Sequence, residues 1–450
     1  MQQFVIDGGN SLNGEVRPGG NKNAILKMLP ACLLTDEPVV LHNVPKIADV
    51  LVTIDIMIEL GAQIEWIGEH SVRVTTADVK TWKLERSLAR RIRASFVFAG
   101  PLLGRFGRAV LPVPGGDVIG ERRVDTHIVA LRRLGVEAEY ERGLFSLHAE
   151  QLTGAPILLR EASVTATENV IMAAVLARGT TVISNAASEP HIQDLCNMLV
   201  NLGAKIDGIG SNQLIIEGVE RLHGGEARVG ADFIEVGSYI GAAVMTGGHV
   251  RIKDADPQHL GMAALVFERL GVRWDVEGQD VIVPASQSLT VVPDIGGRIP
   301  IIKAQPWPAF PPDLMSIALV VATRSAGAIM FHDWMYESRF FFTDKLVRMG
   351  ARITLCDPHR ALVQGPTTLR GVPYISSPDI RAGMALVLAA LGARGETRIS
   401  NIGQIDRGYE RVEEKLLGLG ANIQRIVLDA LATAEITQIQ IEAEMTDKNS

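Results

Sequence analysis

The sequence predicts an α/β protein of two domains, each made of three similar units with helices inside and sheets outside. Three observations support this fold class: a length of 450 residues, a short glycine signature that recurs six times, and six apolar segments between its copies. The signature is Leu or Met, then Gly, then Ala or Val. Its copies lie 68 to 79 residues apart, with their glycines at Gly61, Gly135, Gly203, Gly271, Gly350 and Gly420.

Length and composition fit a well-packed globular chain. Single hydrophobic cores stop growing beyond about 250–300 residues, so a chain of this length is expected to form two or three domains. With 47% hydrophobic and 21% charged residues, the chain has enough apolar material for such cores. The net charge of −7 argues against a general nucleic-acid binder.

Cysteine usage and the first residues favour the cytoplasm. Cys32, Cys196 and Cys356 are widely separated and form neither a disulfide framework nor a Cys-x-x-Cys metal motif. Residues 1–7 run directly into strand-like sequence without a signal peptide, and charges interrupt the longest apolar stretches. We therefore expect a cytoplasmic protein without a membrane span, and no metal or cofactor is indicated.

Each signature glycine is predicted to end an amphipathic helix and to lead into a strand. In the first unit, Leu51, Ile54 and Ile58 share one helical face, and residues 62–66 then alternate between apolar and polar. Glycine is favoured at helix ends because it adopts the left-handed conformation without strain.

The interleaved apolar segments are predicted to be buried helices. A helix that is apolar nearly all round needs enclosure on every side, which sheets wrapped outside it would supply. A unit of about 70 residues is also too long for an ordinary solenoid repeat, which favours two closed domains of three units. The six segments span residues 23–34, 94–103, 169–177, 238–245, 314–322 and 382–391.

A glycine-rich loop at residues 114–120 is the strongest candidate for a functional segment. It carries three glycines around Asp117, and Arg122 and Arg123 follow at once. Glycines leave room for a ligand to approach the backbone, and arginines ahead of a helix capped by Asp125 would make an anion site. The alternative is a surface turn with solvated charges.

Cationic residues recur at the openings of corresponding units in both halves. Two such halves facing each other would form a cleft that suits a phosphate ester or a nucleotide. Lys22 at a helix N-terminus is unfavourable unless an anion is near, although it could simply be solvated. The other cations of this series are Arg93, Arg339, Arg381 and Arg407.

Two carboxylates from different halves are candidates for acid and base roles. Asp117 lies in the glycine-rich loop, and Asp313 opens a predicted buried helix, where it could also be a plain N-cap. From the residues alone, the chain is predicted to be a two-domain enzyme that closes on phosphorylated ligands.

Eight motifs in order along residues 4–425 resemble those of the enolpyruvyl transferases, in particular the branch that acts on sugar nucleotides. Each motif alone is weak, but eight in sequence across six units are specific. They are Gly20-Asn-Lys-Asn-Ala24, Arg93-Ala-Ser95, Pro114-Gly-Gly-Asp-Val-Ile-Gly120, Thr165-Ala-Thr-Glu-Asn169, Asn185-Ala-Ala-Ser-Glu-Pro190, Phe310-Pro-Pro-Asp313, Asp379-Ile-Arg-Ala382 and Ile405-Asp-Arg-Gly-Tyr-Glu-Arg411.

The resemblance implies two inside-out α/β barrels with the active site in the cleft between them. One domain would be discontinuous (residues 1–21 plus 230–426), the other would span 22–229 and carry the loop at 114–122, and 427–450 would be a helical or disordered tail. The implied reaction adds the 3′-hydroxyl of UDP-N-acetylglucosamine to C2 of phosphoenolpyruvate and then expels phosphate, the first committed step towards peptidoglycan precursors.

The resemblance also implies roles by position. Asp117, Asp313, Lys22 and Arg407 would form the catalytic set, with Asp313 as the base and Asp117 as the proton donor. Lys22, Arg122 and Arg407 would hold the phosphate of phosphoenolpyruvate. The remaining substrate-binding residues would be Asn23, Arg93, Arg123, Val124, Asp125, Thr126, Ser163, Val164, Met335, Arg339, Asp379 and Arg381, with Arg339 and Arg381 on the carboxylate.

The chain departs from the family pattern at several positions. Many members carry a cysteine where this chain has Asp117, and fosfomycin alkylates that cysteine, so the resemblance implies an enzyme insensitive to fosfomycin. Glu161 stands where some members have a lysine that touches the nucleotide, and Ala48 replaces a frequent lysine. Two alternatives stay open: transfer to a different nucleotide acceptor, and a non-catalytic paralogue that only binds the nucleotide. We expect a monomer or a weak homo-oligomer.

Overall fold

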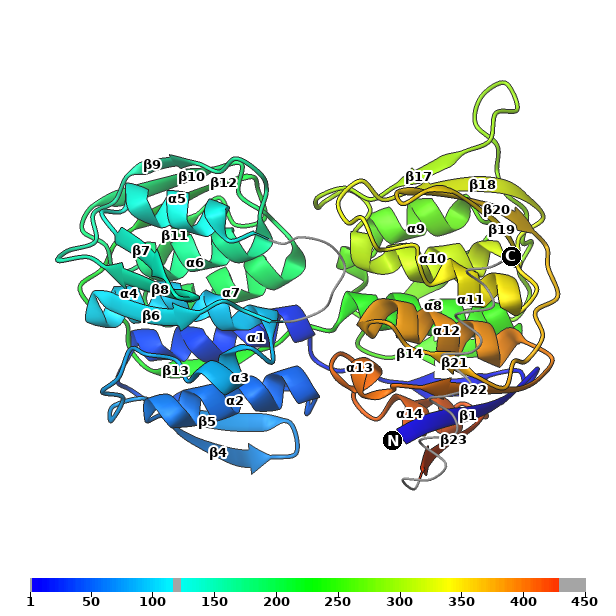
Figure 1. Cartoon of the computed structure of the whole chain (residues 1–450), viewed down its shortest axis with the longest axis horizontal. Coiled ribbons are helices and arrows are strands. Elements are labelled where there is room, and N and C mark those ends of the chain that lie inside the picture. Colours follow the sequence, from blue (N-terminus) through cyan, green and yellow to red (C-terminus); the bar gives the residue numbers. More distant parts are fainter. Residues whose placement is uncertain (1, 116–122, 429–450) are drawn as a thin grey trace.

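A computed structural model describes residues 2–115 and 123–428, which form two lobes side by side (Figure 1). The first lobe has a hydrophobic core drawn from residues 24–229, and the second has its own core from residues 4–16 and 233–423. Where the chain passes between the lobes, Gly20 pairs with Ala231, and the Asn21 N–H donates to the Gly230 carbonyl over 2.8 Å. These crossings lie beside the predicted domain boundaries, between residues 21 and 22 and between residues 229 and 230. That the two lobes are separate domains stays a prediction.

The first lobe contains three sheets, with strand orders β13-β3-β5-β4, β6-β8-β7 and β11-β12-β10-β9. The strands are β3 (Val39–His42), β4 (Gln63–Gly68), β5 (Ser71–Thr75), β6 (Arg108–Pro112), β7 (Glu137–Glu141), β8 (Leu144–His148), β9 (Pro156–Leu158), β10 (Thr180–Ser184), β11 (Lys205–Asp207), β12 (Gln213–Glu217) and β13 (Gly225–Arg228). The helices are α1 (Lys22–Ala31), α2 (Ala48–Leu60), α3 (Arg86–Ala89), α4 (Ala99–Phe106), α5 (Asp125–Arg133), α6 (Val164–Ala174) and α7 (Pro190–Asn201), with short 3-10 turns at Cys32–Leu34 and Arg93–Phe98.

The second lobe also contains three sheets, with strand orders β21-β22-β1-β23, β15-β16-β14-β2 and β17-β18-β20-β19. The strands are β1 (Gln2–Gly8), β2 (Asn13–Val16), β14 (His249–Ile252), β15 (Asp275–Glu277), β16 (Asp280–Val283), β17 (Ile301–Lys303), β18 (Gly327–His332), β19 (Arg352–Asp357), β20 (Arg360–Gly365), β21 (Ile375–Ser376), β22 (Gly395–Ser400) and β23 (Asn422–Val427). The helices are α8 (Phe233–Thr246), α9 (Gly261–Glu268), α10 (Met315–Ala322), α11 (Thr343–Arg348), α12 (Ile380–Gly392), α13 (Gly403–Asp406) and α14 (Val412–Gly418), with 3-10 turns at Pro257–His259 and Pro312–Leu314.

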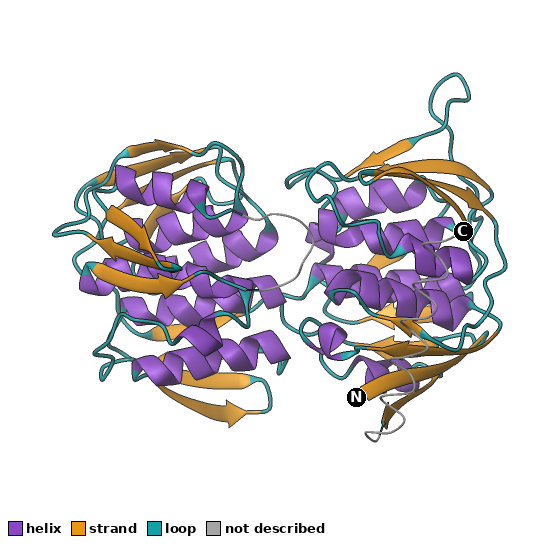
Figure 2. Cartoon of the chain, in the orientation of Figure 1, coloured by secondary structure: helices purple, strands orange, loops and turns teal. Residues whose placement is uncertain are grey.

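The six apolar segments form helices in the interior of the lobes, as predicted. In α10 every residue is buried, and in α12 all but the last are. Figure 2 shows helices enclosed by strands in both lobes. The predicted α/β class, with helices inside and sheets outside, is therefore confirmed, and its cause is that a helix apolar on all faces has to be covered on all faces.

All six signature glycines adopt the left-handed conformation, with φ between 78° and 106°. Gly61 ends α2 in this conformation, and β4 begins two residues later. A side chain would be strained there, which explains why one residue type recurs at the end of each amphipathic helix.

Three local expectations differ from the structure. Asp125 does not cap α5 but is its first residue, with Val124 at the N-cap. Asp313 lies in the 3-10 turn before α10 and makes ion pairs instead of capping the helix. At Gly115, a Cβ atom would lie 1.7 Å from the Arg90 carbonyl oxygen, so the chain's own backbone takes up the space that we had assigned to a ligand.

Two predicted segments fall outside the described residues. They are the centre of the glycine-rich loop, residues 116–122, and the tail from residue 429 onward. Within the described ranges, no helix is both long enough and apolar enough to cross a membrane.

Candidate active site

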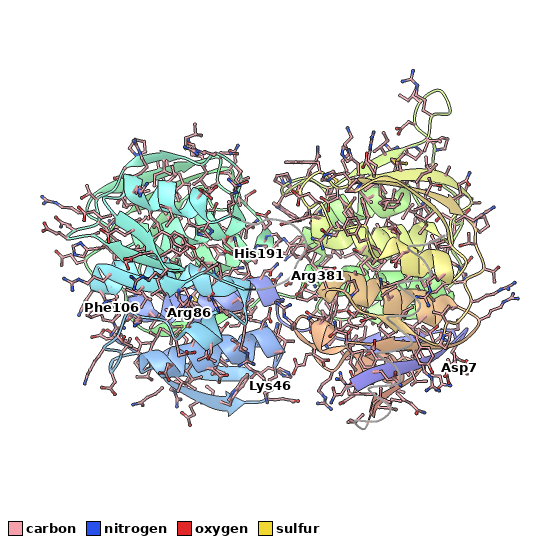
Figure 3. All side chains as sticks on the ribbon, in the orientation of Figure 1. Asp7, Lys46, Arg86, Phe106, His191 and Arg381 are labelled. Carbon is pink, nitrogen blue, oxygen red and sulfur yellow. The ribbon has the colours of Figure 1, made fainter. Side chains whose placement is uncertain are left out.

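A cavity of about 240 Å³ lies between the two lobes, and nine predicted site residues line it. Figure 3 shows His191 of the first lobe and Arg381 of the second at the edges where the lobes face each other. The predicted residues in its lining are Lys22, Asn23, Arg93, Val164, Asp313, Arg339, Asp379, Arg381 and Arg407. The structure thus brings together groups that are up to several hundred positions apart in sequence.

Asp49 joins two of the predicted phosphate-binding cations across the lobes. Its carboxylate lies 2.8 Å from Lys22 Nζ and accepts from Arg407 Nε over 2.9 Å. Burial raises the pKa of Asp49, but Lys22 and Arg407 together bring it below its usual value. Burial lowers the pKa of Lys22, against the attraction of Asp49. Lys22 is therefore a buried, paired lysine at the start of α1, not a solvated one.

Asp313 lies between two arginines of the second lobe. Its Oδ2 accepts from Arg381 Nε over 3.1 Å, and its Oδ1 accepts from Arg339 Nη2 over 3.4 Å. Burial raises the pKa of Asp313, but Arg381 and Arg339 outweigh it and hold that pKa at about 2. Asp313 is therefore a carboxylate at neutral pH, and a weak base as long as both arginines remain paired with it.

Asp379 places Arg381 at the start of α12. Its carboxylate accepts from the backbone N–H groups of Arg381 and Ala382 over 2.8 and 2.9 Å, which makes it the N-cap of that helix. Arg381 is 5% exposed, and its Nη1 atom makes no hydrogen bond to any described residue. A buried guanidinium nitrogen at the wall of a cavity is suited to bind an anion.

The predicted nucleotide-binding stretches of the first lobe lie next to each other. Arg93 Nη2 donates to the Arg123 carbonyl over 3.2 Å, and Thr126 Oγ1 donates to Glu161 Oε1 over 2.8 Å. Ser163 caps α6 by accepting from the Ala166 N–H over 3.4 Å. The stretch that begins α5 is thereby held against the stretch that begins α6.

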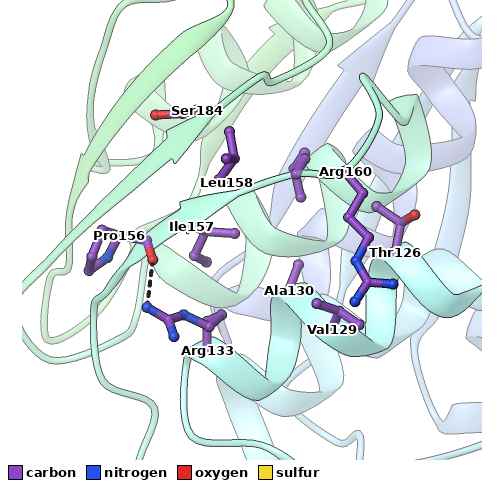
Figure 4. A pocket seen from close by; sticks show the side chains of 10 residues that line it. Thr126, Val129, Ala130, Arg133, Pro156, Ile157, Leu158, Arg160 and Ser184 are labelled. Atoms are coloured by element: carbon purple, nitrogen blue, oxygen red, sulfur yellow. Dashed lines mark hydrogen bonds between the residues drawn. The ribbon is translucent and has the colours of Figure 1, made fainter.

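Thr126 also lines a second hollow, between α5 and β9, where Arg160 lies across from Arg133 (Figure 4). Arg133 Nη2 donates to the Pro156 carbonyl over 3.3 Å. The hollow adjoins Glu161, one of the positions where the chain departs from the family pattern. Arg160, which lines the hollow, precedes Glu161 in the chain.

Other predicted residues do not line the cavity. Arg123, Val124, Asp125, Thr126, Ser163 and Met335 are outside its lining, although Val164 next to Ser163 is part of it. The Met335 N–H donates to Asp333 Oδ1 over 2.9 Å. Asp117 and Arg122, predicted as the proton donor and a phosphate ligand, lie outside the described residues.

The sequence-based prediction missed several charged or polar residues of the lining. Asp49, Lys27, Glu189 and His191 all face the cavity. A signal was present for two of them. Lys27 is a charged residue within a mostly apolar helix, and Glu189 belongs to one of the eight motifs shared with the enolpyruvyl transferases. Asp49 had no such signal, since an acidic residue in the first turn of a helix is ordinary.

The chain is similar to proteins of one family over almost its whole length. The profile of EPSP synthase (3-phosphoshikimate 1-carboxyvinyltransferase) matches residues 6–416. The UDP-N-acetylglucosamine 1-carboxyvinyltransferase of Treponema denticola is 52% identical over 424 residues, which cover 94% of this chain and 99% of that protein. The protein of the same name from Bradyrhizobium diazoefficiens is 51% identical over 424 residues, covering 94% and 98%.

Solved structures agree with the sequence comparisons. The enolpyruvyl transferase NikO from Streptomyces tendae superimposes with a TM-score of 0.84 at 25% identity, covering 95% of this chain and 99% of that one. An EPSP synthase from Acinetobacter baumannii has a TM-score of 0.73 at 17% identity, covering 95% and 100%, and shows that the fold is shared. The chain therefore belongs to the EPSP synthase family of carboxyvinyltransferases.

Proposed function

We propose that this protein transfers the enolpyruvyl group of phosphoenolpyruvate to the 3′-hydroxyl of UDP-N-acetylglucosamine, with release of phosphate. The observation that carries the proposal is the cavity between the lobes, which Lys22, Arg407, Arg381 and Asp313 line together. A dianionic phosphate, a carboxylate and a hydroxyl that must lose its proton would each find a matching group there. The names of the relatives at 52% and 51% identity agree with this reaction.

The reaction requires one base, one acid and two anion sites. Asp313 takes the proton of the 3′-hydroxyl, whose oxygen forms a bond to C2 of phosphoenolpyruvate, while Asp117 gives a proton to C3. C3 then gives a proton back to the Asp117 carboxylate, the double bond reforms, and the bond from C2 to the phosphate oxygen breaks as the phosphate takes up the proton held by Asp313. Lys22 and Arg407, together with Arg122, stabilise the charge of the phosphate as it leaves.

The pairing of Asp313 suggests how substrate binding would activate the base. In the free cleft, Arg381 and Arg339 hold the pKa of Asp313 at about 2. The carboxylate of phosphoenolpyruvate would compete with Asp313 for these arginines and add a negative charge nearby. Both effects raise the pKa of Asp313 and make it a stronger base when the substrate is in place.

The acceptor would bind along the first lobe. Asn23, Arg93 and Val164 line the cavity, and residues 123–126 and Ser163 lie where α5 and α6 begin. Arg122 would complete this set. Met335 and Asp379 would contribute from the second lobe. We also propose that residues 22–229 and residues 1–21 plus 230–426 are the two domains that close on the substrates, and that the protein is a cytoplasmic monomer or weak homo-oligomer.

A phosphate-release assay tests the proposal. Wild-type protein with phosphoenolpyruvate should release phosphate with UDP-N-acetylglucosamine, and far more slowly with UMP or shikimate 3-phosphate. Asp313→Ala should reduce the rate by about 10²–10⁴-fold, the usual range for loss of a general base. Phosphate release at background with every acceptor would favour a non-catalytic paralogue, and equal rates with and without Asp313 would remove the base assignment.

A further inference from the structure

Four polar side chains of the first lobe have no part in the reaction as described above: Lys27, Glu168 and His191 are buried, Glu189 is half-buried, and all but Glu168 line the cavity. Lys27 comes from α1, Glu168 from α6, Glu189 precedes α7, and His191 lies in its first turn. Lys27 Nζ lies 3.5 Å from Glu168 Oε2, and both side chains are almost fully buried. Neither Glu168 oxygen makes a hydrogen bond to a described residue, but Glu168 does not line the cavity, whereas Glu189 and His191 do.

His191 is 3% exposed, and neither of its ring nitrogens has a hydrogen-bond partner among residues 2–115 and 123–428. Glu189 Oε2 likewise has none within those ranges. Buried polar atoms in native proteins are nearly always hydrogen-bonded, because an unpaired one costs about 1–3 kcal/mol. Both side chains line the cavity, so a bound molecule can satisfy them.

The charges around His191 define what it can bind. Burial, Lys27 and Arg381 lower the pKa of His191 well below its usual value, while Asp313 opposes them. The imidazole is therefore neutral at physiological pH and offers one hydrogen-bond donor and one acceptor. A neutral ring beside the carboxyl group of Glu189 gives no attraction to an anion, so this corner does not fit phosphoenolpyruvate.

A hydroxyl group fits because it both donates and accepts a hydrogen bond. An acetamido methyl group would instead need apolar surroundings, whereas the charged side chains of Lys27 and Glu189 line the cavity together with His191. Because Asp313 and His191 line the same cavity, we take this hydroxyl to be a neighbour of the one that Asp313 deprotonates. On N-acetylglucosamine, the neighbours of the 3′-hydroxyl are the 2′-acetamido group and the 4′-hydroxyl.

We propose that His191, with Glu189, forms a subsite that binds the 4′-hydroxyl of the acceptor sugar and so orients the 3′-hydroxyl towards Asp313. This inference rests on the proposed function and adds to it a positioning residue for the acceptor. His191 fixes the acceptor from the first lobe, while Asp313 reaches the reacting hydroxyl from the second. The closed cleft is thus required for the two hydroxyls to be held at once.

The subsite is tested by a double-mutant-type cycle, in which the His191 imidazole and the 4′-hydroxyl of the acceptor are removed separately and together. Steady-state kinetics compare wild type and His191→Leu with UDP-N-acetylglucosamine and with its 4′-deoxy analogue, at saturating phosphoenolpyruvate. Removing either the hydroxyl or the imidazole should lower kcat/KM for the acceptor about 10-fold, as expected for one buried hydrogen bond. Removing both should cost no more than removing one. His191→Gln, which keeps a donor and an acceptor, should recover most of the loss.

His127 provides the matched control. It is also 3% exposed, but its ring nitrogens are bonded to Thr165 Oγ1 at 3.0 Å and to Asn169 Nδ2 at 2.8 Å. His127→Leu should therefore lower thermal stability and affect both acceptors by the same factor, so that its effect adds to that of the missing hydroxyl.

Two results would overturn the subsite. One is a wild type that uses the parent and the 4′-deoxy acceptor equally well, which needs no variant to fold. The other is a His191→Leu variant whose loss adds fully to the loss from the missing hydroxyl. If the wild type releases no phosphate with the parent acceptor, the proposed function itself is wrong, and this outcome is distinct from both.

Discussion

Replacing Asp313 by Asn should lower turnover while leaving phosphoenolpyruvate binding intact. The amide keeps the shape of the side chain but cannot take the proton of the 3′-hydroxyl, so kcat should fall by about 10²–10⁴-fold. Arg339 and Arg381 lose their internal counter-ion and become available to the carboxylate of the substrate. The affinity for phosphoenolpyruvate should therefore be unchanged or higher.

The same substitution should also change stability in a pH-dependent way. The pKa of Asp313 falls from 3.8 to about 2 in the folded protein. At 1.36 kcal/mol per pKa unit this corresponds to about 2 kcal/mol as an upper bound, since the side chain is 31% exposed and solvent screens the pair. Because the folded pKa is lowered, the contribution is present above pH 4 and is lost as pH falls through about 2.

Isothermal titration with phosphoenolpyruvate, steady-state kinetics, and urea unfolding at pH 7 and at lower pH down to about 2 measure these three effects. Asp357→Asn is the matched control, because the Asp357 side chain is also 31% exposed and accepts from an arginine, Arg360 Nε, over 2.7 Å. It lies outside the cavity and should keep wild-type turnover. A wild-type kcat in Asp313→Asn, or loss of phosphoenolpyruvate binding without loss of kcat, would refute the assignment.

Three other substitutions test further groups. Asp49→Asn leaves Lys22 and Arg407 as neighbouring cations without their shared counter-ion. The free energy of unfolding, measured in urea, should fall by about 3–5 kcal/mol and partly recover with inorganic phosphate. An unchanged free energy of unfolding would contradict the pairing. Burial raises the pKa of Glu168 from 4.5 to about 8, so the wild type should lose stability as pH rises across that range and Glu168→Gln should not. If the free energy of unfolding in urea changes with pH equally in both proteins, Glu168 is not a buried ionisable carboxyl. Fosfomycin should leave wild type active and inactivate Asp117→Cys, because a carboxylate is a much poorer nucleophile than a thiolate; time-dependent loss of wild-type activity would count against the role given to Asp117.

The fold was predictable because its signals are local. A helix that is apolar on all faces and a glycine that ends a helix are both visible within about a dozen residues, and together they identified helices such as α10 and the turn at Gly61. Capping was predicted less well. Asp313 precedes an apolar run, but its contacts with Arg339 and Arg381 and not a local hydrogen bond decide its position, while Asp125 lies one residue inside α5.

The candidate site was predictable only in part because its pairs are not local. The cations were recognised from their recurrence at the openings of the units and from family motifs. Their partners were not, since Asp49 and Arg407 are 358 positions apart and neither position implies the other. His191 was missed for the same reason, because a histidine in the first turn of a helix is ordinary until the opposite lobe is seen across from it.

The identity of the product tests the central claim most directly. Wild-type protein is incubated with ¹³C-labelled phosphoenolpyruvate and UDP-N-acetylglucosamine, and ¹³C and ³¹P NMR follow the carbon skeleton and the phosphate. The account predicts one equivalent of inorganic phosphate for each enolpyruvyl ether formed at O3 of the sugar. Phosphate release that does not require the UDP-sugar, or a UDP-sugar recovered without the label, would contradict it.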